Sequence, residues 1–329
     1  MIYKKHIIKA INILLPFVLG GGILYWMYRE FDFTRLEDKV MHEMNWGWMM
    51  FSMIFGIAAQ VFRGVRWRQS LEPLGEKPRT IDCIHAVFIS YATSIFIPRS
   101  GEFTRCGILA KYDSTNFTKA LGTVVSERII DSLLIMLFAL LVLVFQLNIF
   151  NLFLDATSTN LTDMLHGFTT MGYIVTAICL VTTLVFFYII MRRFAFMTQI
   201  KRVVNNMREG IMSLSGVRNK WLFAFYSIMI WVSYFLQYWV TFYCFGFTSD
   251  LSIMVALVSF IVGSFAVIVP TPNGAGAWHF AVKTILILYG VESTNAETFV
   301  LVVHTFQTPL MPLLGAFSMF CLTFRKEKT

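Results

Sequence analysis

The sequence predicts an all-α polytopic membrane protein, with about six spanning helices and two re-entrant helical hairpins arranged as an inverted repeat. Three observations predict this fold class. First, 57% of the residues are hydrophobic and only 14% are charged, with a mean hydropathy of +0.67. Second, the apolar residues form long runs, and about 20 such residues cross a bilayer as a helix. Third, two apolar runs end in proline-containing breaks, "IPRSGE" and "VPTPNGAGAW", where a regular helix cannot continue.

Six uninterrupted apolar segments are long enough to span a membrane. The first follows a basic start and lacks a small-residue cleavage site, so we interpret it as a retained helix and not a signal peptide. No linker is long enough to separate a soluble domain, and residues 1–329 therefore form a single integral membrane domain. The predicted spans cover residues 10–28, 46–62, 120–147, 168–191, 221–246 and 298–323.

The basic residues predict an orientation. We place the N-terminus in the cytoplasm and let each interrupted segment enter and leave on one side. All but five of the 27 Lys and Arg residues are then cytoplasmic, including those of residues 63–79. Because cytoplasmic loops carry an excess of Lys and Arg, we predict a multi-pass protein of the bacterial inner (cytoplasmic) membrane with both termini cytoplasmic. The five exceptions are Arg29, Arg35, Lys39, Arg128 and Lys283.

The net charge of +8 is explained by this topology and by anionic lipid, so no nucleic-acid partner is predicted. Residues 194–220 mix basic and apolar side chains, and both an amphipathic surface helix and a plain cytoplasmic loop fit them. The five cysteines show no CxxC or Cys/His metal spacing. We therefore predict no metal site, no cofactor and no disulfide. The cysteines are Cys83, Cys106, Cys179, Cys244 and Cys321.

The two interrupted segments, residues 81–112 and 251–290, are predicted to be re-entrant hairpins. The return arm of the first is short and carries several charges, so it does not suit a helix facing lipid. Without gaps, Phe88 aligns with Phe260 and Pro98 with Pro270. Two related hairpins that enter from opposite faces would form an inverted repeat, as in many transporters. The alternative is a proline kink in an ordinary spanning helix.

The breaks predict a site at membrane depth. Non-helical backbone is tolerated there only where it is buried in protein or lines a wet cavity. After each break a new helix begins, and helix N-termini attract anions such as phosphate. Prolines stop the preceding helices and glycines permit tight backbone paths. These residues are Pro98, Pro270 and Pro272, and Gly101, Gly274 and Gly276.

Charged residues are embedded in the apolar helix that follows the first hairpin. Glu127 and Asp131 share a face at i, i+4, and Arg128 is within reach of Asp131 at i, i+3. Charges at this depth usually face a bundle interior or a cavity. Two interpretations remain open, namely a lining for a polar headgroup or an ion, and a structural ion-pair network.

Polar residues also follow the second break. His279 and Lys283 are spaced i, i+4 on the return arm of the hairpin, and His304 and Gln307 are spaced i, i+3 on the last span. Both a binding role and a structural role fit them. Another polar stripe lies on the 221–246 span, where interhelical hydrogen bonding is the favoured interpretation. That stripe contains Tyr234, Gln237, Tyr238 and Thr241.

Three motifs occur in order along the chain, "PRSGEFTRCGILAKY", "VVSERIIDSLL" and "PTPNGAGAWHFAV". Together they resemble the lysylphosphatidylglycerol synthase transmembrane-region family, whose members are also called flippase-like membrane proteins. Asn273 stands where the first of two paired glycines is usual, and His279 stands about where many members carry glutamate. The residues that match the family pattern are Pro98, Gly101, Glu102 and Arg105; Glu127, Arg128 and Asp131; and Pro270, Pro272, Gly274 and Gly276.

In the two-part members of that family, this region translocates aminoacylated phosphatidylglycerol, and a separate cytosolic domain makes the lipid. The synthetic domain is absent from this chain. The resemblance therefore implies translocation and not lysyl transfer. No GxSxG, Walker, dinucleotide-binding or HExxH motif is present either, and we do not expect an enzyme.

The main functional hypothesis is a lipid flippase-like protein that moves a phospholipid or aminoacyl-phospholipid headgroup across the bilayer. Arginine suits phosphate because it binds bidentately. The alternatives are an intramembrane transferase acting on a lipid-linked substrate, a small-solute transporter, and a non-catalytic membrane partner of a cell-envelope enzyme. A homo-oligomer and a complex with an envelope-synthesis partner both stay open. The cations expected to hold an anionic headgroup are Arg99, Arg105, Arg128 and Lys283.

Overall fold

The structure, a computed structural model, describes most of the chain as helices. Every regular element in the described ranges is helical, so the all-α prediction is confirmed there. Among the predicted features, Pro98, Arg99, Pro270, the 168–191 span and residues 194–204 lie outside the described residues. The described ranges are 17–29, 31, 33–97, 100–145, 205–206, 208–269 and 271–325.

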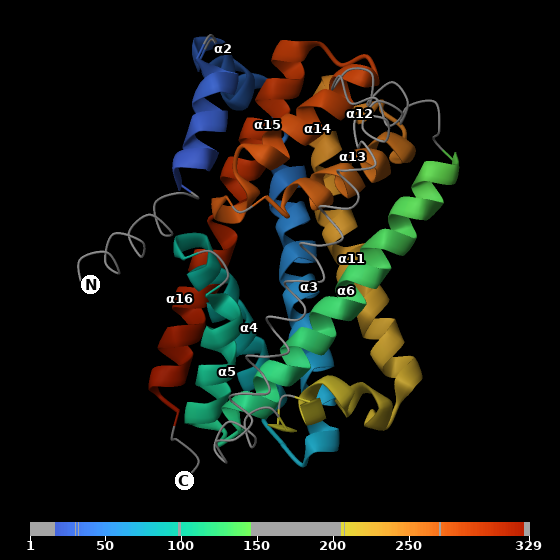
Figure 1. The fold of residues 1–329 in the computed structure, drawn as a ribbon. Helices are drawn as coiled ribbons and strands as arrows, with labels where there is room; N and C mark the ends of the chain where they lie inside the picture. Colours follow the sequence, from blue (N-terminus) through green and yellow to red (C-terminus); the bar gives the residue numbers. More distant parts are fainter. Residues whose placement is uncertain are drawn as a thin grey trace, which may run out of the picture.

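Long helices run through the height of the molecule (Figure 1). They are α3 (Trp46–Leu71), α6 (Phe117–Phe145) and α11 (Lys220–Val240), with α15 (Ser293–Gln307) followed by α16 (Leu310–Thr323). Three described stretches are long and apolar enough to cross a membrane, Trp46–Leu74, Lys220–Cys244 and Ser293–Thr323. The shorter elements are α2 (Phe33–Asp38), η1 (Lys39–Glu43), η2 (Glu72–Leu74), η3 (Ser213–Gly216), η4 (Thr241–Cys244) and α12 (Gly246–Ser249).

Two helices differ from their predicted bounds. α3 continues to Leu71 and does not end at residue 62, so Arg63 and Arg66 are helical and buried. Their placement in a cytoplasmic loop was wrong, because carboxylates of other helices neutralise them inside the bundle. The 298–323 span is in fact two helices, which are separated at Pro309 because proline has no N–H to continue the helical hydrogen bonds.

Each interrupted segment forms a pair of short helices. The first pair is α4 (Thr80–Phe96) and α5 (Gly101–Tyr112), which pack against each other. The second pair is α13 (Ile253–Ala266) and α14 (Ala277–Leu288), with the turn η5 (Pro272–Gly274) in its break. Figure 1 places the first pair in the lower half of the molecule and the second pair in the upper half. Because α4 contacts η5, the two pairs meet in the middle.

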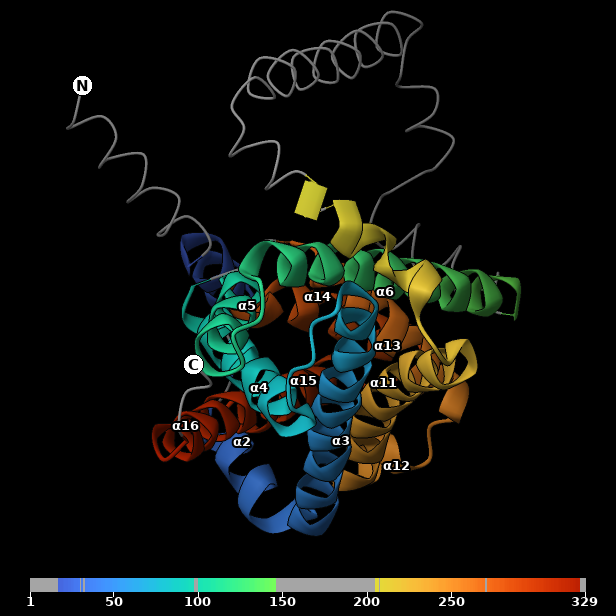
Figure 2. The ribbon, with the colours of Figure 1, turned by 90° about the horizontal axis from the view of Figure 1, so that it is seen from below.

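Small residues permit close packing around α4. Gly101 lies so near α4 that a Cβ atom would come 2.1 Å from the Ser90 carbonyl oxygen. On the other side, a Cβ atom on Gly315 of α16 would come 2.3 Å from Ala92 Cβ. α4 is therefore held between α5 and α16, while α3 packs on α11, as Figures 1 and 2 both show.

The first described helix, Phe17–Tyr28, packs on the break of the second pair. A Cβ atom on Gly20 would lie 3.3 Å from both the Ala275 carbonyl oxygen and Thr271 Cβ. The Tyr28 hydroxyl donates to the Glu297 carbonyl oxygen at 3.4 Å, a contact between residues 269 positions apart in the chain. The N-terminal helix therefore depends on residues near the C-terminus for its packing.

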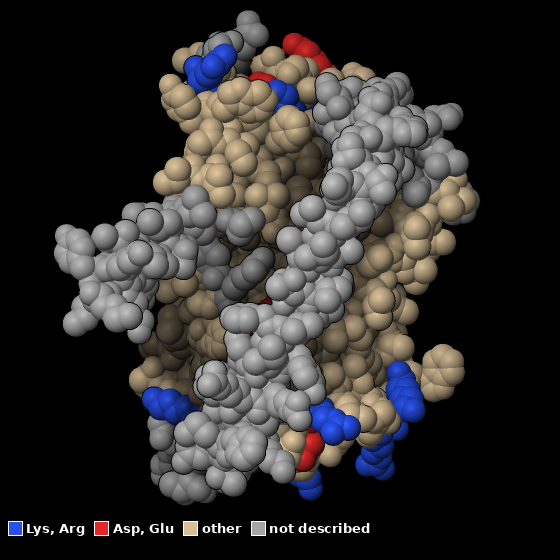
Figure 3. Space-filling model, viewed as in Figure 1, with Lys and Arg blue, Asp and Glu red and all other residues tan. Residues whose placement is uncertain are grey.

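The outer surface has the character of a membrane protein. α6 exposes large apolar side chains such as Leu133, Leu140 and Val144. In the view of Figure 3, the described Lys and Arg side chains gather at the lower and upper ends, and most of the described surface between them is tan. This distribution fits a lipid-facing belt between two polar rims.

We predict that Gly101→Ala destabilises the protein because the added methyl group clashes with α4 backbone and with the Ser94 hydroxyl, 2.4 Å away. Overpacking of this kind costs about 1–3 kcal/mol, and the melting temperature of the detergent-purified protein should fall. Gly107→Ala on the same helix is the matched control, since a Cβ atom there meets nothing within 4 Å. That variant should be unchanged or stabilised by up to about 1 kcal/mol. Equal melting temperatures for the two variants would contradict the close approach of α5 to α4.

Candidate functional site

A cavity of about 830 Å³ lies where the two helix pairs meet. Its lining comes from α3, α4, α5, α6, α11, α13, α14, α15, the start of α16 and the break before α14. Seven of the predicted site residues lie in this lining. They are Glu102, Arg128, Asp131, Asn273, Gly274, His304 and Gln307.

Below the cavity, a buried glutamate holds two arginines from different helices. Glu127 of α6 is fully buried. Its Oε1 atom lies 3.3 Å from Arg66 Nε of α3, and its Oε2 atom accepts a 2.9 Å hydrogen bond from Arg105 Nη1 of α5. The Arg105 guanidinium also lies over the Trp67 ring, 4.7 Å from its centroid. Glu127 and Arg105 thus join three helices and do not line the cavity.

Asp131, one turn further along α6, extends this network to the cavity wall. Its carboxylate lies 2.6 Å from Arg63 Nη1 and 2.8 Å from Arg66 Nη1. Arg66 Nη1 also donates to the Ser227 hydroxyl of α11 at 3.2 Å. The expected pairing of Arg128 with Asp131 was wrong, because the two arginines of α3 occupy that carboxylate.

Arg128 pairs instead with Glu102 of α5. Arg128 Nε donates to Glu102 Oε1 at 2.8 Å. Both side chains face the cavity and are partly exposed, at 44% for Arg128 and 36% for Glu102. The other ion pairs of this network are almost completely buried, so the Arg128–Glu102 pair is the accessible one.

Hydroxyl and amide groups form the adjoining wall. Gln60 Nε2 donates to the Tyr234 hydroxyl at 2.9 Å, and the Tyr234 hydroxyl donates to the Tyr91 hydroxyl at 3.1 Å. The Arg63 guanidinium lies 5.8 Å from the centroid of the Tyr91 ring and 5.9 Å from that of Tyr234. Electron-rich ring faces stabilise a cation at such distances.

The polar stripe of α11 both lines the cavity and bonds to a neighbouring helix. Tyr234, Gln237 and Tyr238 line the cavity. The Tyr238 hydroxyl also donates to Ser259 of α13 at 2.9 Å, which is an interhelical hydrogen bond. Thr241 instead donates to the Tyr238 carbonyl oxygen within its own segment.

The opposite wall is the break of the second pair. Asn273 has a positive φ of 51°, and its side-chain amide donates to the Thr308 hydroxyl at 2.9 Å. His304 Nε2 lies 3.1 Å from the Asn273 carbonyl oxygen, and His304 Nδ1 lies 3.3 Å from the Thr308 hydroxyl. These contacts are consistent with a neutral ring that donates from Nε2 and accepts at Nδ1. They attach the break to the end of α15.

Gln307 continues this wall toward α3 and α11. Its Nε2 atom donates to the Ser52 hydroxyl at 3.1 Å and to the Gln237 carbonyl oxygen at 3.2 Å.

Other predicted residues lie outside the cavity lining. His279 is buried, and its Nδ1 atom accepts from the Gly276 N–H at 3.3 Å, so that N–H of the break already has a partner. The His279 and His304 rings lie 4.5 Å apart between centroids. Lys283 forms an ion pair with Glu297 of α15. The predicted residues that are described but absent from the lining are Gly101, Arg105, Glu127, Pro272, Gly276, His279 and Lys283.

The cavity is also lined by four residues that were not predicted as site residues, Gln60, Arg63, Tyr91 and Trp231. The spacing of charged residues in the sequence could have indicated that Arg63 and Arg66 are buried ion-pair partners. Arg63 and Arg66 are spaced i, i+3 directly after an apolar run, and Glu127 and Asp131 are spaced i, i+4 in another. Such spacings place each set on one helix face, and facing sets of opposite charge are expected to pair.

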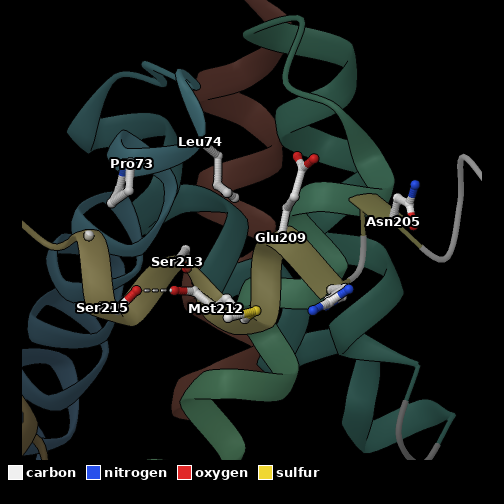
Figure 4. A pocket seen from close by; sticks show the side chains of 9 residues that line it. Pro73, Leu74, Asn205, Glu209, Met212, Ser213 and Ser215 are labelled. Carbon is white, nitrogen blue, oxygen red and sulfur yellow. Dashed lines mark hydrogen bonds between the residues drawn. The ribbon is translucent and has the colours of Figure 1, made fainter.

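A second hollow, of about 610 Å³, lies between the η2 turn and residues 205–216. Figure 4 shows Pro73 and Leu74 across from the segment that carries Glu209, Met212 and Ser213. None of the residues of the ion-pair network lines it. The larger cavity is therefore the candidate site.

We predict that Glu127→Gln strongly destabilises the protein, because Arg66 and Arg105 lose the carboxylate that they share. Breaking a buried ion pair by removing one partner typically costs about 3–5 kcal/mol. The measurement is thermal unfolding in detergent. Glu72→Gln is the control, since it removes a surface pair with Arg68 and should cost at most about 1 kcal/mol. If the double variant with Arg105→Gln loses as much as the two single variants together, the proposed coupling is wrong.

Comparison with known proteins gives one match. Residues 13–315 match the profile of the family described as Lysylphosphatidylglycerol synthase TM region. No curated protein and no solved structure matches the chain. The match covers nearly the whole chain and confirms the resemblance carried by the three motifs. The chain therefore belongs to the lysylphosphatidylglycerol synthase transmembrane-region family, a family of membrane proteins.

Proposed function

We propose that this protein moves the headgroup of a phospholipid or aminoacyl-phospholipid across the bilayer through the cavity between its two helix pairs. The observation that carries the proposal is the composition of the cavity lining. Charged side chains of α3, α5 and α6 share it with apolar side chains at the ends of both helix pairs. An amphiphile needs both kinds of surface, whereas a small polar solute needs only the first.

In this proposal the two helix pairs are re-entrant and enter from opposite faces of the membrane. α4 has 17 residues and α5 has 12, so at 1.5 Å per residue they are about 26 Å and 18 Å long. α13 and α14, with 14 and 12 residues, are similarly short. A hydrocarbon core is about 30 Å thick, and neither helix of a pair has to cross it if both return to the side they came from.

Arg128 is the residue proposed to receive the headgroup phosphate. It faces the cavity, and its present partner Glu102 is partly exposed. Guanidinium groups bind phosphate oxygens through two parallel hydrogen bonds. Arg105 and Glu127, which lie behind the wall, would position α5 and α6 and not touch the lipid.

The acyl chains would stay in the bilayer while the headgroup passes between the pairs. The ends of the pairs supply apolar side chains for this purpose, including Ile95 on α4 and Ile268 before the second break. Access to each face would alternate as one pair and then the other moves away from the cavity.

Reconstituted protein should move fluorescently labelled phospholipid between liposome leaflets, and Arg128→Ala should slow this movement by at least about tenfold. The expected loss corresponds to a charged hydrogen bond worth about 1.5–3 kcal/mol. The measurement is the rate at which a membrane-impermeant quencher reaches the label.

Arg218→Ala is the control for that experiment. Arg218 is an exposed arginine outside the cavity lining, so this variant should move lipid at the wild-type rate. Equal rates for Arg128→Ala, wild type and protein-free liposomes would reject the proposed function.

The re-entrant arrangement makes a separate prediction about topology. Cysteines introduced at Lys77 and Lys111, at the two ends of the first pair, should both react with an impermeant maleimide from the cytoplasmic face. Cysteines at Asp250 and Glu292, at the two ends of the second pair, should both react from the opposite face. All four positions are exposed. The reaction is measured in inside-out and right-side-out vesicles of a variant without native cysteines.

A different labelling pattern would contradict the re-entrant arrangement. If the two ends of either pair react from different faces, that pair crosses the membrane and is not re-entrant. Lys220→Cys serves as a further reference, because Lys220 begins the candidate span Lys220–Cys244 and is predicted to be cytoplasmic.

A further inference from the structure

We infer that the cavity selects a phosphodiester headgroup with a net negative charge, and that Glu102 occupies the phosphate position on Arg128 until the headgroup displaces it. The inference rests on the proposed function and narrows its substrate class. It depends on three observations about the ion-pair network of α3, α5 and α6. They are its net charge, its buried hydrogen-bond donors without partners, and the exposure of its ion pairs.

The charge balance of the network is positive. Four guanidinium groups share three carboxylates through contacts of 2.6–3.3 Å. No other Asp or Glu among the described residues lines the cavity. A buried charge without a counter-ion costs several kcal/mol, so one negative charge from a ligand would neutralise the network. The arginines are Arg63, Arg66, Arg105 and Arg128, and the carboxylates are those of Glu102, Glu127 and Asp131.

Unused hydrogen-bond donors lie beside this excess charge. Arg63 lines the cavity, and its side chain is 97% buried, with 3% exposed. Its Nη1 atom binds Asp131, but its buried Nε atom has no hydrogen-bond partner among the described residues. Arg66 Nη2 is also buried without a partner in the described part of the chain, but Arg66 lies behind the lining. Donors left unsatisfied in a buried site favour a ligand that supplies acceptor oxygens.

The exposures indicate which ion pair a ligand would open. The side chains that pair with Glu127 and Asp131 are all at most 3% exposed. Arg128 and Glu102, at 44% and 36%, are the partly exposed pair. Exchanging the Glu102 carboxylate for a phosphodiester oxygen keeps a charge-assisted hydrogen bond on Arg128. The exchange therefore costs little there, whereas opening the buried pairs would leave charges without partners.

The net charge of the headgroup then decides which phospholipid the cavity binds most tightly. A monoanionic phosphodiester brings the network to neutrality. A zwitterionic headgroup leaves the excess positive charge in place, and a headgroup esterified with lysine adds a further positive charge. We therefore expect phosphatidylglycerol to bind more tightly than phosphatidylethanolamine or lysyl-phosphatidylglycerol.

A lipid, and not a free phosphate compound, is the expected source of this phosphodiester. The lining of the cavity includes an apolar set at the ends of the two helix pairs, next to the charged wall. Part of this apolar set is exposed at the surface, and Ile268 retains 67% of its accessible surface. The set comprises Ile95, Val267, Ile268 and Val269, and Met311 at the start of α16 also lines the cavity.

The test is equilibrium binding to the detergent-purified full chain, followed by native mass spectrometry. The probes are phosphatidylglycerol, phosphatidylethanolamine, lysyl-phosphatidylglycerol and the soluble glycerophosphoglycerol. Glu102→Gln should tighten binding of phosphatidylglycerol by about tenfold, which is the gain expected if the Arg128–Glu102 pair is closed about nine-tenths of the time. Phosphatidylethanolamine should gain less, because its phosphate gains the same access to Arg128 while its ammonium group loses the attraction of the Glu102 carboxylate.

Glu72→Gln is the matched control. It removes the same charge from an Arg–Glu pair of similar exposure, 42% for Arg68 and 41% for Glu72, that lies outside the cavity lining. Binding of every probe should be unchanged in that variant. Arg128→Gln should weaken binding of phosphatidylglycerol, and thermal unfolding of each variant checks that it is folded.

Three results would overturn the inference. They are unchanged or weaker binding of phosphatidylglycerol to folded Glu102→Gln, tighter binding of lysyl-phosphatidylglycerol than of phosphatidylglycerol to the wild type, and glycerophosphoglycerol binding as tight as that of the lipid. These results do not depend on transport. Selective binding without leaflet exchange would uphold the inferred site and reject the proposed function.

Discussion

The shared carboxylates of α6 are the constraint on which the lower half of this molecule depends. Charges are expensive inside a membrane protein and persist only when they are paired. Glu127 holds Arg66 and Arg105, and Asp131 holds Arg63 and Arg66. These contacts fix the height and rotation of α3, α5 and α6 relative to one another.

The accessible ion pair follows from this constraint. Glu102 lies one turn before Arg105 on α5, and Arg128 is the residue after Glu127 on α6. Once Arg105 is held by Glu127, the preceding turn of α5 brings Glu102 to Arg128. The buried network therefore positions the pair that faces the cavity.

The upper half is held together by different forces. Around the second break the contacts are neutral hydrogen bonds among Asn273, His304 and Thr308. Behind them, Tyr238, Phe242 and Phe299 pack edge to face. The cavity thus has a charged wall on α3, α5 and α6 and a largely neutral wall on the second pair. A charged group between them would meet a gradient of electrostatic potential and not a symmetric environment.

Local chemistry made some features predictable. Proline removes a backbone donor wherever it stands, so the segments 81–112 and 251–290 agree closely with α4–α5 and α13–α14. Partners across helices were less predictable. Arg63 and Arg66 were assigned to a loop because a count of basic residues contains no information about carboxylates more than 60 positions away. Lys283 was expected near a headgroup, yet Glu297 of the next helix is its partner. Spacing identifies which residues share a face, and only the packing of helices identifies what that face meets.

The packing of the helix Phe17–Tyr28 has a consequence for biogenesis. Gly20 and Ile23 rest on residues 271–276, and Tyr28 reaches Glu297 across 269 positions of sequence. During synthesis this helix leaves the ribosome before those residues exist. It must therefore wait in lipid or beside the insertion machinery until residues 271–297 have been made. Packing of this helix on the second break is then a late step, which follows the insertion of the second pair.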